Sequence, residues 1–391
     1  MKLQILIFAL LCAFSQHLSA QSAEEIHAQA IVVDTHNDFL TKAVDDGMVL
    51  DRDLTGKTHS DLIRWKKGGL DVQVFSVFCD GDKKNPFRYA NLQMDSLDAV
   101  LARNPDKIAK VATVTDLQKV VNQKKIAALI GVEGGHMIEN NLKNLDVFYK
   151  RGARYMTLTW NNSTAWASSA FDEKFTKNLP HKGLTDFGKQ VVHKMNQLGM
   201  LVDVSHVGEQ TFWDVLKTTT KPIIASHSSV YRLCPHQRNL KDDQIKAIAK
   251  NGGVVQINFN PGFVDSTFGK KNEAFLHQHQ VEFDSLTKSG MNEWNRESFL
   301  YGKYNAESDA IRPPFSLVIQ HIEYVIKLIG VDYVGLGSDF DGITLTPQQL
   351  VDVACYPMIT KALVGRGYSQ KDINKILGGN FLRVLKANEP K

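Results

Sequence analysis

Three histidines and three carboxylates stand at the ends of short apolar runs in this sequence. They are His36, Asp38, Glu133, His206, His227 and Asp339. Imidazole nitrogens and carboxylate oxygens are the natural ligands of divalent metal ions. Without a metal, the burial of so many polar and charged groups in one place would be very costly in free energy. We therefore predict that these side chains form a metal centre.

The number of candidate ligands predicts two metal ions. Five residues are candidates, whereas one catalytic zinc usually takes three protein ligands: His36, Asp38, Glu133, His206 and His227. Glu133 could bridge two ions about 3.5–4 Å apart that hold a hydroxide between them. Asp339 is then the expected proton shuttle, which takes a proton from the bridging water and passes it to the leaving group. Because the set contains no thiolate, an open hydrolytic site is favoured over structural zinc.

The elements that must position these residues are eight short apolar runs, separated by longer amphipathic stretches. The runs span 31–34, 72–78, 127–133, 154–160, 200–206, 222–227, 254–259 and 333–339. They are almost continuously apolar, as is typical of parallel strands that are covered on both faces. Helical patterns lie between them at 142–149, 185–198, 209–216, 242–249 and 315–329. Gly199, Gly252 and Gly330 are placed to end three of these helices.

The alternation of eight strands with helices predicts an α/β fold, the (β/α)8 TIM barrel. A doubly wound sheet is the alternative, but no glycine-rich phosphate-binding sequence follows the first run. In a barrel the carboxyl ends of all strands open on one face, so the candidate ligands are expected to converge there. His36 and Asp38 are two positions apart, which directs both side chains the same way in an extended segment.

The segment 260–313 breaks this rhythm between the seventh and eighth strands. It is polar, and we expect an insertion above the barrel that is partly helical, with a disordered loop as the alternative. It lies where it could cover the site as a lid or form a contact between subunits, so a homodimer is one expectation. The predicted organisation is a signal peptide at 1–20 and one catalytic domain at 21–391.

Composition and charge exclude several classes of protein and partner. The 391 residues are 43% hydrophobic and 23% charged, with a net charge of +4 and no long basic block. This excludes disordered and fibrous classes, and it disfavours nucleic acid or an anionic membrane surface as a partner. Residues 1–20 have the pattern of a secretory signal peptide cleaved near Ala20, with an apolar run shorter than the ~20 residues of a membrane anchor. We expect an exported protein, periplasmic or extracellular, without a membrane anchor.

Six segments that carry these residues resemble the membrane (renal) dipeptidase family of zinc metallopeptidases. They are VVDTHNDFL (32–40), GVEGGH (131–136), RYMTLTW (154–160), DVSHVG (203–208), ASHSSVYRLCPHQRN (225–239) and VGLGSDFDG (334–342). The resemblance implies a barrel whose dinuclear zinc site hydrolyses dipeptides. It implies one zinc held by His36, Asp38 and Glu133, and a second held by Glu133, His206 and His227. Asp339 matches the acid/base residue of the family, and Arg238 matches an arginine of the substrate pocket that suits a carboxylate.

One position departs from the family pattern. Trp160 stands where members such as the renal enzyme carry a histidine that contacts the substrate and helps to polarise the reacting carbonyl. We expect Trp160 to form a wall of the pocket, and Asn161 or Asn162 to donate to the oxyanion in place of that histidine. A packing role for Trp160 is the alternative. The substitution leaves the zinc ligands unchanged but bears on the identity of the substrate.

Three functional hypotheses follow from these observations. The first is a zinc-dependent dipeptidase with two zinc ions and a small dipeptide as substrate. The second is a related metal-dependent amidohydrolase that acts on another amide or a lactam, and Trp160 is the reason for considering it. The third is a metal-binding barrel without catalytic activity, which is disfavoured because every ligand position and Asp339 match the family.

Overall fold

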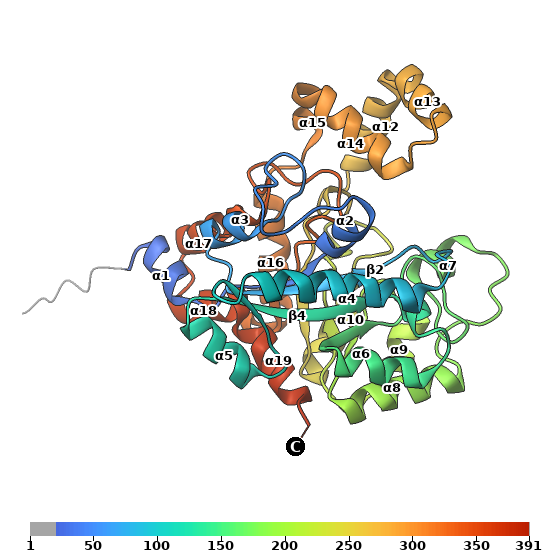
Figure 1. The fold of residues 1–391 in the computed structure, drawn as a ribbon, viewed down its shortest axis with the longest axis vertical. Coiled ribbons are helices and arrows are strands. Elements are labelled where there is room, and N and C mark those ends of the chain that lie inside the picture. Colours follow the sequence, from blue (N-terminus) through green and yellow to red (C-terminus); the bar gives the residue numbers. More distant parts are fainter. Residues whose placement is uncertain (1–20, 391) are drawn as a thin grey trace, which may run out of the picture.

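The computed structural model describes residues 21–390, and the predicted signal peptide at 1–20 lies outside them. Its centre is a ring of eight parallel strands, with helices packed around it (Figure 1). The strands are β1 (Val33–Asn37), β2 (Val72–Phe78), β4 (Ile126–Glu133), β5 (Ala153–Thr157), β6 (Leu201–Asp203), β7 (Ile224–Ala225), β8 (Val254–Ile257) and β9 (Val334–Leu336). A parallel bridge between Asn37 and Phe340 joins the first and last strands of this order. The ring is nearly closed, and the predicted (β/α)8 barrel is confirmed.

Several strands end earlier than the apolar runs predict. Strands β6, β7 and β9 stop before His206, His227 and Asp339, which therefore lie in the loops at the carboxyl ends of the strands. At His206 and Asp339 φ is +63° and +66°, a left-handed conformation that keeps these two residues out of the strands that precede them. A ninth short strand, β3 (Ile108–Lys110), pairs with the beginning of β4 and was not predicted from the sequence.

Helices follow most of the strands and cover the outside of the ring. The α-helices before and around the barrel are α1 (Ala23–Gln29), α2 (Phe39–Asp45), α3 (Leu62–Lys67), α4 (Pro86–Arg103), α5 (Val114–Asn122), α6 (Leu142–Lys150), α7 (Ala170–Phe175), α8 (Asp186–Leu198), α9 (Glu209–Thr218), α10 (Asp242–Asn251), α16 (Ser316–Ile329), α17 (Tyr356–Gly365), α18 (Gln370–Asn374) and α19 (Asn380–Asn388). Short 3-10 segments η1 (Gly135–Ile138), η2 (Val331–Tyr333) and η3 (Val353–Cys355), and a π-helical turn η4 (Lys375–Gly379), complete the connections. Within residues 21–390, no helix is long and apolar enough to span a membrane.

The predicted helix-ending glycines have the expected backbone. Gly199 follows α8 with φ +78° and Gly252 follows α10 with φ +81°, the left-handed conformation that glycine adopts without a steric penalty. Gly330 follows α16 with φ +93°. Each of these turns directs the chain back into the next strand of the ring.

Apolar side chains fill the barrel below the site and the layer between strands and helices. Val33, Val74 and Leu129 from three of the strands pack in one buried cluster with Phe381 and Val384 of α19. This cluster closes the lower end of the ring, as layers of inward-facing side chains do in other barrels. The polar residues at the carboxyl ends of the strands are therefore supported on a rigid apolar floor.

The segment 260–313 is helical and connects β8 to α16. Its helices are α11 (Pro261–Val264), α12 (Phe268–Gln278), α13 (Gln280–Lys288), α14 (Glu293–Lys303) and α15 (Asn305–Ile311). Figure 1 shows α12 to α15 standing above the barrel, where Phe275, Leu300 and Tyr301 form a small apolar core. A cavity of about 940 Å³ lies between this segment and the barrel, and its lining includes Trp294 of α14 and Lys42 of α2.

Candidate metal centre

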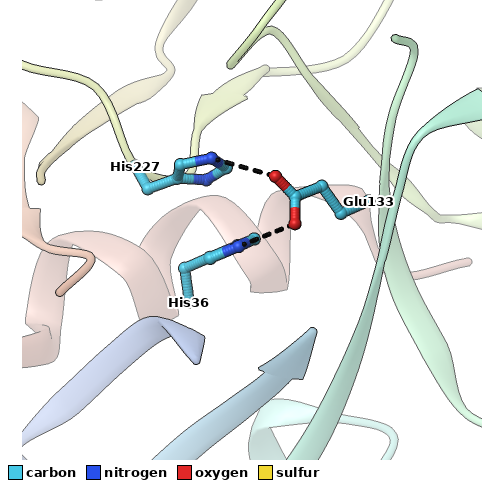
Figure 2. Close-up of side chains that lie close together, drawn as sticks. All are labelled: His36, Glu133 and His227. Carbon is cyan, nitrogen blue, oxygen red and sulfur yellow. Dashed lines mark hydrogen bonds and ion pairs between the residues drawn. The ribbon is translucent and has the colours of Figure 1, made fainter. Parts of the chain in front are cut away.

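The carboxylate of Glu133, at the end of β4, lies among the three predicted histidines, two of which, His36 and His227, are drawn in Figure 2. Its Oε2 is 3.1 Å from Nε2 of His36, while its Oε1 is 2.9 Å from Nε2 of His206 and 3.3 Å from Nε2 of His227. All four side chains are buried. The two oxygens of one carboxylate therefore face different histidines, His36 on one side and the His206–His227 pair on the other.

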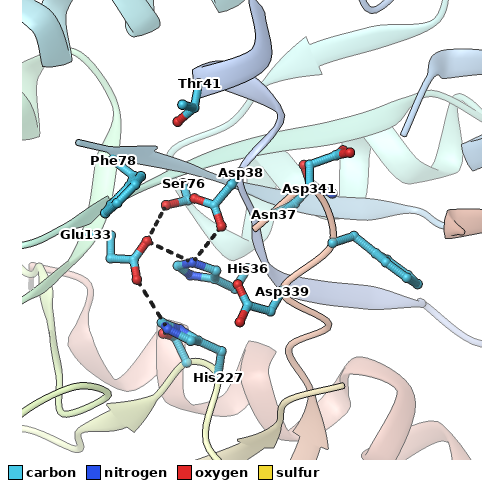
Figure 3. Close-up of polar contacts among 12 residues, drawn as sticks. His36, Asn37, Asp38, Thr41, Ser76, Phe78, Glu133, His227, Asp339 and Asp341 are labelled. Atoms are coloured by element: carbon cyan, nitrogen blue, oxygen red, sulfur yellow. Dashed lines mark hydrogen bonds and ion pairs between the residues drawn. The ribbon is translucent and has the colours of Figure 1, made fainter. Parts of the chain in front are cut away.

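Asp38 and Asp339 lie on the His36 side of this carboxylate (Figure 3). Oδ2 of Asp38 is 3.4 Å from Nε2 of His36, as their spacing in the sequence predicts. His36, Asp38 and Asp339 each present an atom within 4.8 Å of the others. Oδ1 of Asp38 is buried and has no hydrogen-bond partner among residues 21–390. A buried carboxylate oxygen without a donor is a position that a cation would satisfy.

A hydrogen bond on the far side of the His36 ring determines which of its two nitrogens faces the carboxylates. Nδ1 of His36 is 2.8 Å from the hydroxyl of Tyr155, and that hydroxyl donates to the carbonyl of Thr35 at 3.0 Å. The Tyr155 oxygen must then accept a hydrogen bond from Nδ1–H of His36. Nε2 is then the nitrogen that faces Asp38 and Glu133; although burial lowers the pKa of His36, Tyr155 and the two carboxylates outweigh it and raise that pKa well above its usual value.

The same argument holds for the other two histidines. The hydroxyl of Ser226 donates to Oδ2 of Asp203 at 2.6 Å, so it accepts from Nδ1 of His227 at 2.8 Å. Oδ1 of Asn161 lies 3.2 Å from Nδ1 of His206 and accepts from it. Nε2 of His206 and Nε2 of His227, only 3.0 Å apart, both point lone pairs at the same region.

This donor set fits a bound metal. Nitrogens of three imidazoles and oxygens of three carboxylates converge in one buried place, and a cation bound there would compensate the negative charge of the carboxylates. Burial and then the charge of Arg238 lower the pKa of His206 to about 3, and burial lowers the pKa of His227 well below its usual value. Both rings are therefore neutral at pH 7, the form in which histidine binds metals.

The Asp339 carboxyl is held in an unusual environment. Burial raises its pKa to about 8, with the negative charges of Asp38 and Glu133 adding to the shift and His36 opposing it. Nδ2 of Asn258 donates to Oδ2 of Asp339 at 2.9 Å. A carboxyl that changes protonation near neutral pH beside a metal centre is suited to carry protons.

The loop after β9 contains Gly342, whose missing side chain leaves room for the carboxylates of Asp38 and Asp339 to lie close together. A Cβ at Gly342 would lie 2.1 Å from Oδ2 of Asp38 and 2.5 Å from Oδ1 of Asp339. Neither distance is sterically possible, so both carboxylates occupy space that any other residue at 342 would fill. The positive φ of Asp339 adds local strain of the kind that persists where the surroundings fix the conformation.

The three predicted substrate-pocket residues lie beside the centre. Arg238 is buried, donates from Nη2 to the carbonyl of His227 at 3.2 Å, and has no partner for its Nε among the described residues. Trp160 is partly exposed, with its ring centroid 6.3 Å from that of His206 and 4.9 Å from that of Phe78. Asn161 contacts His206 through its amide oxygen, which leaves only the amide nitrogen as a donor.

Sequence reasoning missed the residues that orient the ligands. Tyr155, Ser226 and Asn258 fix His36, His227 and Asp339 respectively. A further one is Ser76 of β2, whose hydroxyl donates to Oε2 of Glu133 at 3.2 Å. The available signal was weak: each is a polar residue inside one of the predicted apolar runs, and such residues also occur for packing reasons.

Comparisons with known proteins identify the family of this chain. The model of the family described as "Membrane dipeptidase (Peptidase family M19)" matches residues 20–390. An uncharacterized dipeptidase of Schizosaccharomyces pombe is 33% identical over 397 aligned positions, covering 96% of this chain and 84% of that protein.

Two solved structures have the same fold at lower identity. The probable dipeptidase PvdM of Pseudomonas aeruginosa superposes with a TM-score of 0.77 at 24% identity, covering 94% of this chain and 97% of its own. A metallopeptidase of Rhodobacter sphaeroides, solved with a phosphinate mimic of the dipeptide L-Ala-D-Ala, gives a TM-score of 0.74 at 22% identity, covering 92% and 100%. With the family model matching nearly the whole chain, the protein belongs to the membrane dipeptidase family of metallopeptidases, peptidase family M19.

Proposed function

We propose that the protein hydrolyses the peptide bond of dipeptides at a centre of two zinc ions. The observation that carries this proposal is that the two carboxylate oxygens of Glu133 face different histidines. Oε2 faces His36, and Oε1 faces His206 and His227. A carboxylate that serves two separate ligand groups is suited to bridge two ions. Zinc bound there supplies the Lewis acidity that polarises the scissile carbonyl and lowers the pKa of water.

The ligands divide into two groups that share one residue. His36, Asp38 and Glu133 would hold the first ion, and Glu133, His206 and His227 would hold the second. Imidazole and carboxylate ligands suit zinc, and the hydrogen bonds that the histidines donate from Nδ1 to Tyr155, Asn161 and Ser226 orient Nε2 as the ligating nitrogen. The unpartnered Oδ1 of Asp38 gives the first group an additional ligand atom.

Asp339 is proposed as the group that moves protons. Its position beside His36 and Asp38 would let its carboxylate accept a proton from the attacking water and release that proton to the leaving amine. Asn258 holds Oδ2 of Asp339 by a hydrogen bond, so Oδ1 is the oxygen available for the transfer.

Arg238, Trp160 and Asn161 are proposed to contact the substrate. Arg238 is a buried permanent cation beside the centre, which suits the α-carboxylate at the C-terminus of a dipeptide. Trp160 forms a wall next to His206. The amide nitrogen of Asn161 makes no hydrogen bond among residues 21–390, and it is the side-chain donor available to the reacting carbonyl oxygen.

Metal analysis and dipeptide hydrolysis of the purified protein test the proposal. We expect two zinc ions per chain and turnover of simple dipeptides such as Ala-Ala. Glu133→Ala combined with His206→Ala should abolish both, whereas His277→Ala, an exposed histidine on α12, should change neither. Full activity in the double variant, or a single equivalent of metal in the active wild type, would overturn the two-ion mechanism.

A related amidohydrolase activity on another amide or a lactam is the second candidate. Trp160 favours it, because an apolar ring lies against His206 where the family pattern carries a histidine. A screen of L,L- and L,D-dipeptides against β-lactams and cyclic amides distinguishes the two. Faster turnover of a cyclic amide than of every dipeptide would establish this second function instead.

The organisation of the chain is also a proposal. We propose that residues 1–20 are a signal peptide that directs export and is cleaved near Ala20, on the basis of their sequence pattern. Residues 21–391 then act as one catalytic domain in which 260–313 is an insertion. N-terminal sequencing of the protein recovered from cell envelope or medium tests this; a retained Met1 would contradict it.

A further inference from the structure

A second cavity, of about 350 Å³, opens beside the metal centre at the carboxyl ends of β6 and β7. Val204, His206 and Arg238 form its buried floor, and Lys174 and Lys182 are exposed at its rim. Its size is in the range of sites that bind small molecules. Because His206 and Arg238 both line it, this cavity adjoins the proposed position of the substrate carboxylate.

The ionisable side chains that line this cavity carry an excess of positive charge. Lys174, Lys182, Arg238 and Lys241 are cations, whereas Glu173 and Glu209 are the acidic residues of the lining. Two positive charges therefore remain after the acidic residues are counted.

The lysines at the rim differ in whether they form an ion pair with a carboxylate. Lys241 is paired with Glu209 at 2.6 Å. Nζ of Lys174 donates to the neutral amide of Gln237 at 3.1 Å, and Lys182 forms no ion pair or hydrogen bond with any of the described residues. The carboxylate of Glu173 is occupied by the hydroxyl of Ser168 and a backbone N–H at the start of α9. Lys174 and Lys182 are thus the cations left without a carboxylate.

We propose that this cavity receives the C-terminal residue of the dipeptide and selects aspartate or glutamate there. The inference rests on the proposed function, in which Arg238 binds the α-carboxylate. That carboxylate neutralises one of the two excess charges, and a side-chain carboxylate on the same residue neutralises the other. Lys174 and Lys182 are the specificity-determining residues, and they act on substrate binding rather than on the chemical step.

Matched dipeptides that differ only in one charge test the inference. The kcat/KM of the zinc-loaded enzyme is measured for Ala-Glu, Ala-Gln and Ala-Ala. We expect Ala-Glu to exceed Ala-Gln by about fivefold, mostly through KM, because a solvent-exposed charge pair makes a contribution of that size. The preference should fall as salt is added, since exposed charges are screened.

Substitution of the two lysines identifies the source of the preference. In Lys174→Gln combined with Lys182→Gln, we expect Ala-Glu and Ala-Gln to become equal while Ala-Ala turnover is retained. Lys177 is an exposed lysine between these two positions that does not line the cavity, so Lys177→Gln should keep the preference. Retention of the preference in the double variant would overturn the inference.

The outcomes also separate this inference from the proposed function. If the enzyme hydrolyses Ala-Ala in a zinc-dependent manner but treats Ala-Glu and Ala-Gln alike, the acidic preference is wrong and the dipeptidase function stands. If no dipeptide is hydrolysed with zinc present, both are wrong.

Discussion

A methyl group at Gly131 would lie 2.0 Å from Cζ of Tyr155, so the ring of Tyr155 lies directly against the backbone of β4. This close approach places the Tyr155 hydroxyl under His36, where it accepts a hydrogen bond from Nδ1 at 2.8 Å. The ligating nitrogen of His36 is therefore positioned through a contact made inside the barrel, beneath the metal centre.

Tyr155→Phe should weaken metal binding by about 10- to 100-fold, because outer hydrogen bonds to a ligating histidine contribute effects of that size. The variant removes the acceptor for Nδ1–H of His36 and leaves the ring packing in place. Zinc affinity measured by competition with a chelator checks it, with Tyr324→Phe as control, since that hydroxyl contacts Asp242 at the surface. Equal affinity in wild type and Tyr155→Phe would contradict the prediction.

Ser226→Ala should weaken binding of one zinc equivalent while the other is retained. Ser226 connects the buried carboxylate of Asp203 to Nδ1 of His227, which belongs to the second ligand group only. A two-step chelator titration should therefore show a loss of affinity at one site in Ser226→Ala. Tyr155→Phe should affect the other site, and if both variants weaken the same equivalent, the division of ligands is incorrect.

Gly342→Ala should lower kcat by about 100-fold, the cost of misplacing catalytic groups by about 1 Å. Its Cβ would occupy space held by the carboxylates of Asp38 and Asp339. Kinetics with dipeptides, combined with circular dichroism to establish folding, measure the effect. Gly365→Ala is the matched control, because a Cβ there has no neighbour within 4 Å, and its activity should equal that of the wild type.

Asp71→Asn should make stability less dependent on pH. Burial raises the pKa of Asp71 to about 6, with the Val32 N–H and Lys124 opposing the shift. A folded-state pKa above the unfolded value means that ionisation destabilises the fold. The stability that the protonated Asp71 carboxyl contributes is therefore lost as pH rises from about 4 through 6. The pKa shift alone corresponds to a loss of about 3 kcal/mol in the free energy of unfolding above pH 6. Because the Asp71 side chain is partly exposed, we expect a loss of about 1–2 kcal/mol.

Urea unfolding at pH 4, 6 and 8, at constant zinc, measures this effect. Asp71→Asn keeps an oxygen to accept from Val32 N–H, which is 2.9 Å from the carboxylate in the wild type. It should be more stable than the wild type at pH 8 and similar at pH 4. Asp106→Asn, at an exposed position, is the control. A wild-type stability that rises between pH 4 and 8, relative to Asp71→Asn, would refute the assignment.

The barrel and the convergence of its ligands could be predicted because they depend on patterns that repeat along the chain. Eight apolar runs and the glycines after helices are local signals, and the closing of parallel strands into a ring brings their ends together whatever the loops do. His36 and Asp38 could be paired because an extended chain alternates its side chains. These inferences need no knowledge of distant contacts.

The orientation of the ligands could not be predicted, because it depends on single contacts between residues far apart in the chain. Tyr155 and His36 are separated by 119 positions, and Asn258 and Asp339 by 81. Nothing in the sequence distinguishes Ser226 as a partner of His227 from a serine that only caps a turn. The left-handed backbone at His206 and Asp339, which places both residues outside β6 and β9, likewise could not be predicted from the sequence.

The small core of the segment 260–313 has an evolutionary consequence. Phe275, Leu300 and Tyr301 pack mainly with one another, and none of the six residues of the metal centre comes from this segment. Substitutions, exchanges or shortening of α12 to α15 can therefore accumulate without moving a ligand. We therefore expect relatives that share this barrel to differ most in the segment above it, and hence in which molecules reach the same catalytic residues.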